Sequence, residues 1–155
     1  MRNAITMVGL VSALALSACG GEKGDNLGRF VGTWRATAGT ITTACPGYTP
    51  STEPVTDSIT WSLGVSSDLV ATDADCAIMA NVAGSTATGA PGVVCSGAVS
   101  DGLVATLTLT SYTFVISPDG HTATENESGG ITYVADGATI PCTFNATASY
   151  QKIGN

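Results

Sequence analysis

The chain is poor in basic residues and in charge of either sign. Its 155 residues include 5 Lys+Arg against 12 Asp+Glu, which gives a formal net charge of −7. Nucleic acids and anionic lipid headgroups are bound by cations that neutralise phosphates, so we expect neither kind of partner. Charged residues make up only 11% of the chain whereas hydrophobic residues reach 44%, which excludes a disordered acidic tail.

The motifs of common catalytic and metal sites are also lacking. The sequence has no Gly-rich phosphate loop, no H-E-x-x-H or G-x-S-x-G motif and no C-x-x-C spacing. His121 is the single histidine, and no Ser or Cys nucleophile can be placed beside it, so a solvated hairpin residue is the favoured interpretation. We therefore expect no enzymatic activity, no catalytic residue, no cofactor and no metal site.

Two groups of acidic residues are candidates for a catalytic pair or a metal site. Glu125 and Glu127 share one face of a predicted strand and could form a carboxylate pair, but glycosidases need a sugar cleft on a larger scaffold. An exposed acidic strand edge that discourages aggregation is predicted instead. Asp68, Asp73 and Asp75 could offer oxygen ligands to calcium, but the Gly and terminal Glu of an EF-hand loop are missing, so we expect solvated loop residues.

The longest apolar run stands at the N-terminus. Residues 4–16 are apolar with two interruptions, which is the length of a signal-peptide core and too short to span a bilayer. The sequence Leu-Ser-Ala-Cys that follows over residues 16–19 resembles the lipobox of bacterial lipoproteins. The resemblance implies cleavage after Ala18, diacylglycerol on the sulfur of Cys19 and acylation of the new amine. An ordinary secretory signal, with Cys19 a chance thiol, is the alternative.

This interpretation divides the chain into three parts. Residues 1–18 are expected to be a lipoprotein signal peptide, residues 19–28 a lipidated cysteine and a Gly-rich flexible tether, and residues 29–155 a single β domain. The resemblance places the protein outside the cytoplasm, with its lipid in the membrane of the cell envelope. Gly20, rather than Asp, favours the outer membrane.

Alternation of apolar and polar residues dominates the chain after residue 28. Residues 30–36 and 103–109 alternate, and no helical stripe is sustained. The inward parity changes between Leu109 and Tyr112, so either a bulge or a bend lies there. Turn signals separate the runs by roughly ten to twenty residues, which predicts an all-β antiparallel meander of about eight to ten strands. To hide its apolar face, such a sheet closes into a small barrel or a flattened barrel or sandwich.

Four cysteines remain once Cys19 is assigned to lipid. They form an even set in an oxidising compartment, which predicts two structural disulfides. Of the three pairings we favour Cys76–Cys95, because these residues flank the turn signal at residues 84–85 as cross-strand neighbours would. Cys45–Cys142 then ties an early strand to the last one, which a closed sheet brings together.

One motif in the β domain resembles a known family. The run Phe-Val-Gly-Thr-Trp over residues 30–34 resembles the G-x-W motif that opens lipocalins. The resemblance implies an eight-stranded barrel of the calycin type whose base is closed by the indole of Trp34. Lipocalins stack a late Arg on that indole, whereas the last run here supplies only Lys152. A core Trp on a first strand is the alternative.

These observations predict a membrane-anchored, non-enzymatic lipoprotein whose β domain acts as a structural or interaction module. The alternative is a lipocalin-like carrier of a small lipophilic ligand, in which Trp34, Trp61 and Phe114 line the cup. A periplasmic protease inhibitor with the N-terminal stretch as an inserted arm ranks third, because anchoring at the same end conflicts with insertion. A barrel filled by side chains supports the module, whereas an apolar cavity of roughly 300 Å³ or more supports the carrier.

Overall fold

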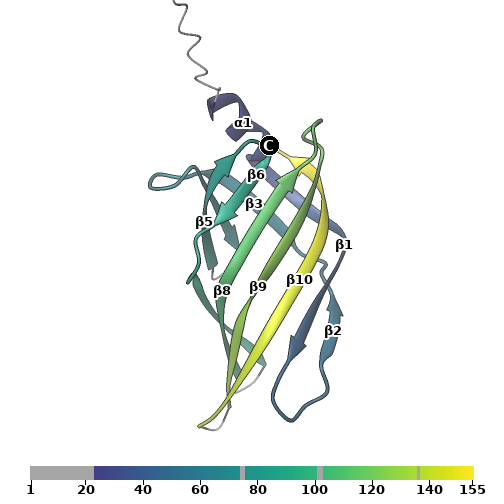
Figure 1. Cartoon of the computed structure of the whole chain (residues 1–155), viewed down its shortest axis with the longest axis vertical. Helices are drawn as coiled ribbons and strands as arrows, with labels where there is room; N and C mark the ends of the chain where they lie inside the picture. Colours follow the sequence, from purple (N-terminus) through teal and green to yellow (C-terminus); the bar gives the residue numbers. More distant parts are fainter. Residues whose placement is uncertain (1–22, 74–75, 101–102, 136) are drawn as a thin grey trace, which may run out of the picture.

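The computed structural model describes residues 23–73, 76–100, 103–135 and 137–155. In this part of the chain one short helix precedes ten strands (Figure 1). The elements are α1 (Lys23–Phe30), β1 (Gly32–Ala44), β2 (Ser51–Pro54), β3 (Ser58–Leu63), β4 (Leu69–Asp73), β5 (Cys76–Ala83), β6 (Thr86–Gly89), β7 (Val94–Ser100), β8 (Leu103–Ile116), β9 (Thr122–Ala135) and β10 (Ala138–Gly154).

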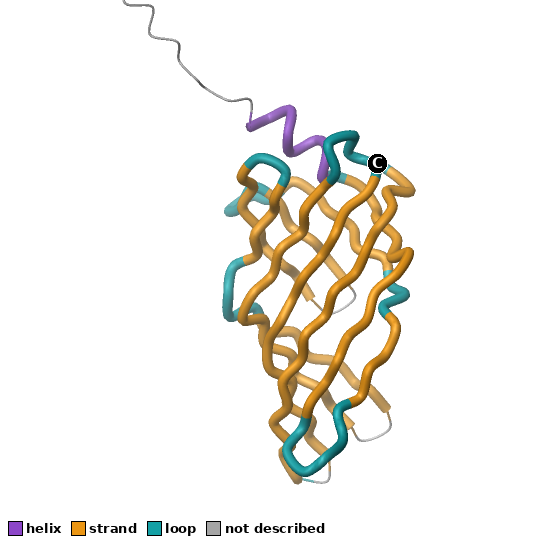
Figure 2. Tube along the Cα trace, turned by 45° about the vertical axis from the view of Figure 1, so that its right-hand side comes forward, coloured by secondary structure: helices purple, strands orange, loops and turns teal. Residues whose placement is uncertain are grey.

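Eight of these strands form a closed antiparallel barrel. Their order is β10-β9-β8-β6-β5-β4-β3-β1, and pairing of β1 with β10 closes the ring. The other two strands extend the sheet: β2 pairs with the second half of β1, and β7 pairs with the first half of β8. Figures 1 and 2 show the long strands β8, β9 and β10 running side by side along the molecule, with α1 at one end. The all-β barrel predicted from the alternation is confirmed.

The parity change in β8 is a β-bulge. The pairing of β8 with β9 shifts register between Leu109 and Ser111, so one extra residue faces the partner strand there. Leu109 on one side of the bulge and Tyr112 on the other are both buried inside the barrel. The bulge therefore keeps both halves of this long strand facing the core although their parities differ.

Aromatic side chains fill the end of the barrel that α1 covers. Phe114 lies at the centre of this cluster, and its ring centroid is 5.3 Å from that of Trp34 and 5.7 Å from that of Trp61. Phe30, the last residue of α1, and Tyr150 of β10 pack on the same ring. All five side chains are buried. These five side chains form an aromatic plug at the α1 end.

The helix α1 corrects the expectation of a flexible tether over residues 19–28. Residues 23–28 belong to the helix, and the half-buried Leu27 packs against the core. The guanidinium of Arg29 donates hydrogen bonds to the carbonyl oxygens of Ser117 and Pro118 at 2.7 Å each, which ties the helix to the β8–β9 turn. The Gly-rich composition indicated mobility, but residues 23–28 form a helix that the tertiary contacts of Leu27 and Arg29 hold against the barrel. Cys19 and the predicted signal peptide lie outside the described residues.

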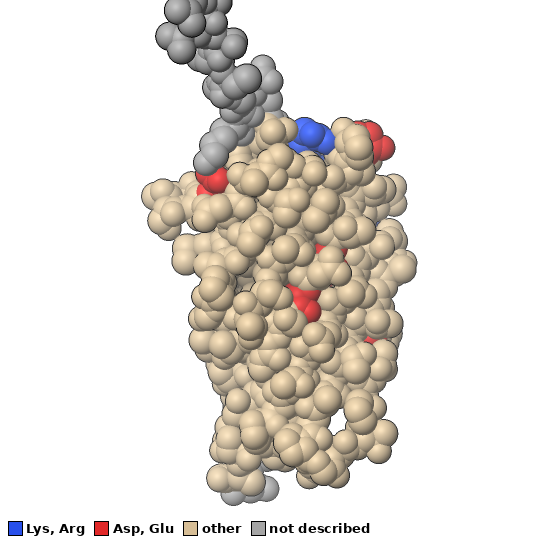
Figure 3. Space-filling model, viewed as in Figure 1, with Lys and Arg blue, Asp and Glu red and all other residues tan. Residues whose placement is uncertain are grey.

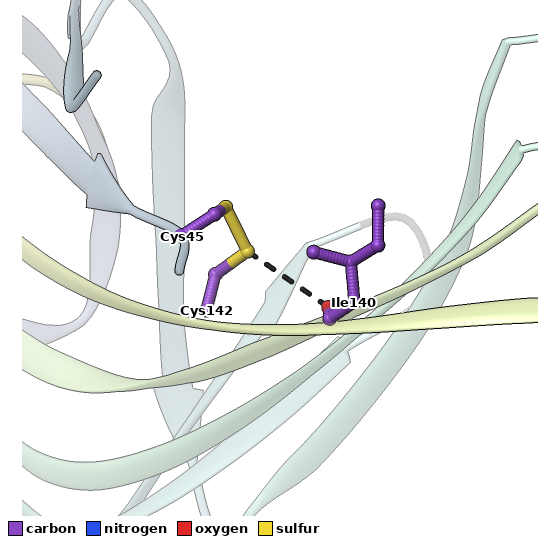
Figure 4. Close-up of a disulfide and its surroundings, with 3 residues drawn as sticks. All are labelled: Cys45, Ile140 and Cys142. Carbon is purple, nitrogen blue, oxygen red and sulfur yellow. Dashed lines mark hydrogen bonds between the residues drawn. A yellow bond between two sulfur atoms is a disulfide. The ribbon is translucent and has the colours of Figure 1, made fainter. Parts of the chain in front are cut away.

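Both predicted disulfides are present. Cys45 and Cys142 lie at the other end of the barrel, at a Cα–Cα distance of 4.2 Å, where the ends of β1 and β10 meet (Figure 4). The Sγ of Cys142 is 3.8 Å from the carbonyl oxygen of Ile140. Cys76 and Cys95 are bonded as well, but not as neighbours across the predicted turn. The partner of β5 across that turn is β6, and Cys95 lies on β7, so the pairing was right and its reason wrong.

Charged groups are sparse on the face of the molecule that Figure 3 shows. Most of that surface belongs to uncharged residues, and the blue of Lys and Arg gathers at the α1 end. Among the described residues, no helix has the length and apolar character needed to cross a membrane.

Candidate functional site: a carboxyl-lined cavity in the barrel

A cavity of about 310 Å³ lies inside the barrel. Its lining comes from the β2–β3 connection and from β3, β4, β5, β7, β8, β9 and β10. It is apolar over much of its surface: Val55, Ile59, Ala71, Ile78, Leu107 and Leu109 all contribute. The Cys76–Cys95 disulfide forms part of the wall. The polar groups are Asp57, Ser58, Glu125, Glu127 and Tyr150. The site is therefore an apolar chamber with a small number of carboxyl and hydroxyl groups.

Glu125 is the most buried of these carboxyl groups, since the residue is only 7% exposed. The hydroxyl of Tyr112 donates a hydrogen bond to its Oε1 at 2.5 Å, and the hydroxyl of Tyr150 donates to its Oε2 at 2.6 Å. Each carboxyl oxygen thus accepts a proton donor, as an ionised carboxylate does. Burial raises the pKa of Glu125, while the two tyrosine hydrogen bonds oppose that rise. The pKa values of Tyr112 and Tyr150 are raised as well, first by burial and then by the negative Glu125.

Glu127 lies two residues farther along β9, on the same inward face. Its side chain is half-buried, and its carboxyl group makes no hydrogen bond within the described residues. Burial, and secondarily the nearby Glu125, raise the pKa of Glu127 to about 7. On β10 the residues opposite Glu125 and Glu127 are Ala148 and Ala146, whose small side chains leave space beside the carboxyl groups.

A glycine on β6, the strand next to β8, helps to position this group. A side chain at Gly89 of β6 would place its Cβ 2.9 Å from the Cβ of Tyr112. Only a residue without a Cβ accommodates Tyr112 where its hydroxyl reaches Glu125. The carboxyl pair, its tyrosine donors and this glycine come from β6, β8, β9 and β10, so the closed barrel brings the site together.

The cavity carries negative groups without positive ones. Asp57, Glu125 and Glu127 line it, and no Lys, Arg or His is among its lining residues. The basic side chains whose contacts are described lie elsewhere: Arg29 and Lys152 bond backbone oxygens at the α1 end, and Arg35 is exposed on β1. Within the described residues no group of three or more His, Cys, Asp or Glu side chains is arranged to hold a metal ion. The cavity can therefore recognise a ligand by its charge in apolar surroundings.

The three aromatic residues predicted as a ligand cup or core belong to the core. Trp34, Trp61 and Phe114 are fully buried, and none of them is among the residues that line the cavity. The indole of Trp34 donates a hydrogen bond to the carbonyl oxygen of Phe30 at 2.8 Å. Lys152 lies over the same indole, with its Nζ 5.5 Å from the ring centroid, and donates to the carbonyl oxygen of Arg29 at 3.1 Å. These residues close the barrel above the cavity.

Trp61 leaves one polar atom unsatisfied. Its Nε1 is the only buried side-chain nitrogen or oxygen without a hydrogen-bond partner in the described ranges. The ring centroid of Trp61 is 6.0 Å from that of Tyr112, whose hydroxyl bonds Glu125.

The remaining sequence expectations have mixed outcomes. The exposed acidic edge predicted for Glu125 and Glu127 is wrong, because β9 is an inner strand between β8 and β10 and both residues face inward. His121 is exposed in a turn, as predicted. The carboxylate of Asp68 accepts a hydrogen bond from the backbone N–H of Val82 at 2.9 Å, so it has a structural contact. Asp75 lies outside the described residues, as does the side chain of Asp73.

Sequence reasoning missed Asp57, Tyr112 and Tyr150 as site residues. The alternation of residues 142–150 could have placed Tyr150 inside the barrel, but only the closed sheet brings it to Glu125. Comparison of the chain with family models, with curated proteins and with solved structures finds no match. The function is therefore argued from the cavity itself.

Proposed function

We propose that the protein is a non-enzymatic carrier that holds a small, mostly apolar ligand inside the barrel. The cavity of about 310 Å³ with its largely apolar lining supports this proposal. A volume of roughly 300 Å³ marks the lower end of small-molecule sites, and the mouths and interiors of β-barrels are a common place for them. This favours the carrier over the interaction module that the sequence placed first, since that module requires an interior filled by side chains.

The closure of the barrel supports the same proposal. The G-x-W motif stands at the start of β1, its Trp34 packs at the closed end, and Lys152 lies over the indole where lipocalins place an Arg. This arrangement is similar to a lipocalin base and is consistent with a lipocalin-like carrier.

A pair of matched variants tests the carrier. Ala71 lines the cavity and is buried, so Ala71→Phe fills it, whereas Ala77→Phe adds the same side chain to an exposed position on β5. We expect the full chain to bind the small uncharged fluorophore 1-naphthol, and we expect Ala71→Phe but not Ala77→Phe to lose that binding. Urea unfolding of both variants checks that they are folded. Equal binding by both variants, or no binding by the wild-type chain, would contradict the proposal.

Native mass spectrometry gives an independent test of the same function. Protein purified from its own host is expected to carry a co-purifying small molecule, and to release it on unfolding. A ligand-free mass for the native protein, together with no binding of the fluorophore, argues for the structural module instead.

We further propose that the carrier is exported and anchored to the cell envelope by lipid on Cys19, with the outer membrane favoured. The two disulfides support a location outside the reducing cytoplasm. The lipobox-like residues 16–19 support the anchor, because two or three acyl chains hold a protein at a membrane durably. The intact mass of the native protein is expected to show loss of residues 1–18 and gain of fatty acids. Retention of those residues, or absence of fatty acids, would refute the anchor.

A further inference from the structure

We propose that the ligand of this cavity is an organic cation, a protonated amine with a short apolar body, whose ammonium group is held by Glu125 and Glu127. This inference rests on the proposed carrier function, because it names the class of ligand that the carrier takes.

The first argument is uncompensated negative charge. Three carboxyl groups line the cavity, of which Asp57 is exposed to solvent and Glu125 and Glu127 face inward, and no basic side chain lines it. Glu125 is 7% exposed and accepts a hydrogen bond at each oxygen, but both donors are neutral hydroxyl groups. A buried anion without an opposite charge is unfavourable even when it is hydrogen-bonded, because neutral donors replace only part of its hydration. The missing positive charge has to come from outside the described part of the chain, and a ligand in the cavity is placed to supply it.

The carboxyl group of Glu127 is the direct contact. It faces the cavity, lacks a hydrogen bond of its own within the described residues, and stands beside the anionic Glu125 on the same strand face. A primary ammonium has three donors, and an N⁺–H···O⁻ bond is stronger than its neutral counterpart. Glu125 is held in place by Tyr112 and Tyr150, so it adds fixed negative potential.

The second argument concerns the apolar walls. A bare metal ion requires several oxygen ligands around it, and no group of three or more suitable side chains is arranged for that in the described ranges. The cavity walls include Ile59, Ile78 and Leu107, which favour an organic body over water. Taking about 30 Å³ for each water-sized group, the volume holds about ten non-hydrogen atoms. An alkyl or aryl amine of that size meets both conditions.

Other ligand classes fit less well. A carboxylate or phosphate would add a further negative charge beside Glu125 and Glu127, which raises the free energy of the bound state. A neutral lipid would fill the apolar space but would leave both carboxyl groups without a counter-charge. An amine is therefore the ligand class that matches both the apolar walls and the carboxyl groups of the cavity.

The test compares three probes of equal length on the full chain. Hexylamine, 1-hexanol and hexanoate differ only in their polar ends, and a titration of each into protein-free detergent corrects for its partition into micelles. At pH 8 the amine is protonated and Glu127, with its pKa near 7, is ionised. Isothermal titration calorimetry is expected to show that hexylamine binds about tenfold more tightly than 1-hexanol, the difference between a charged and a neutral hydrogen bond. Hexanoate is expected to bind most weakly.

Two variants that each remove one carboxylate assign the effect to the cavity. Glu127→Gln keeps the shape of the side chain and is expected to abolish the advantage of hexylamine over 1-hexanol. Glu53→Gln makes the same change on the exposed strand β2 and is expected to leave that advantage intact. Both variants are expected to bind 1-hexanol as the wild-type chain does.

The outcomes separate this inference from the carrier proposal. Equal binding of amine and alcohol, tighter binding of hexanoate, or an amine advantage that survives in Glu127→Gln would overturn the amine and leave the carrier standing. Failure of all three probes and of the neutral fluorophore would overturn the carrier itself. An advantage lost equally in Glu53→Gln would show that general surface charge is responsible, and would also overturn the inference.

Discussion

Replacing Glu127 by Gln is expected to stabilise the ligand-free protein at pH 8 and to leave its stability nearly unchanged at pH 4. The pKa of Glu127 is raised from 4.5 to about 7 in the folded protein, mainly by burial. The folded state therefore binds a proton more tightly than the unfolded state does. Because the folded chain holds more protons between those two pKa values, the free energy of unfolding falls as the pH rises from about 4.5 to about 7.

The magnitude follows from the two pKa values. A pKa that moves from 4.5 to about 7 corresponds to about 3 kcal/mol of unfavourable free energy once the group is ionised. Glu127 is half-buried, so water reduces this figure, and we expect Glu127→Gln to gain about 1–3 kcal/mol at pH 8. At pH 4 Glu127 is protonated in both states and resembles Gln, so the two proteins should be equally stable.

Urea unfolding of the full chain with intact disulfides, followed by tryptophan fluorescence between pH 4 and pH 8.5, measures this difference. Trp34 and Trp61 are both buried and report loss of the core. Glu53→Gln, on the exposed strand β2, should show no comparable gain at either pH. The reasoning is refuted if Glu127→Gln is no more stable than the wild-type protein at pH 8, or if its gain is the same at pH 4. When an amine is bound, its positive charge should stabilise ionised Glu127, so Glu127→Gln should no longer be more stable than the wild-type protein at pH 8.

Three further changes test the fold around the site. Phe114→Ala removes the ring that contacts most of the aromatic plug and should lower the free energy of unfolding by about 3–5 kcal/mol in urea titrations; a loss below about 1 kcal/mol would contradict its central role. Replacing both Cys45 and Cys142 by Ala opens a loop of 97 residues and should lower the thermal midpoint of unfolding. The chain-entropy effect lowers the free energy of unfolding by up to about 4.7 kcal/mol. An unchanged midpoint would show that the disulfide is dispensable. Gly129→Ala would push its Cβ into the carbonyl oxygen of Thr108 and should cost about 1–3 kcal/mol, whereas Gly130→Ala has ordinary van der Waals contact only and serves as the control in the same assay.

Local patterns in the sequence predicted the all-β antiparallel sheet, but they left barrel and sandwich open and missed α1. Alternation along residues 103–116 predicted both a long strand and its change of parity, because side chains of a strand alternate between the two faces whatever the rest of the sheet does. The pairing of Cys45 with Cys142 followed from closure, since a closed sheet brings its first and last strands together. These features depend on the two-residue period of a strand and on closure of the sheet, and both can be argued from a single sequence.

The candidate site depends on contacts that local patterns do not carry. Glu125 and Glu127 were correctly placed on one face, but their charge led to the wrong face being chosen, because acidic residues are usually exposed. What makes the inward position tolerable is the pair of hydroxyl groups of Tyr112 and Tyr150, which lie 13 and 25 residues from Glu125 along the chain. A long-range polar network of this kind is not encoded in any spacing.

The short strand β6 makes one side of the barrel less firmly bonded than the others. It has four residues, whereas its neighbour β8 and the adjacent β9 each have 14. Of β5 it pairs with Ala80–Ala83 alone, so the first half of β5 has no strand on that side within the described ranges, and the Cys76–Cys95 bond crosses the interval to β7. Amide hydrogens of β6 should therefore exchange with solvent sooner than those of β9 and β10. Local opening of this side of the sheet, restrained by the Cys76–Cys95 disulfide, would admit solvent to the interior while the long strands β8, β9 and β10 stay paired.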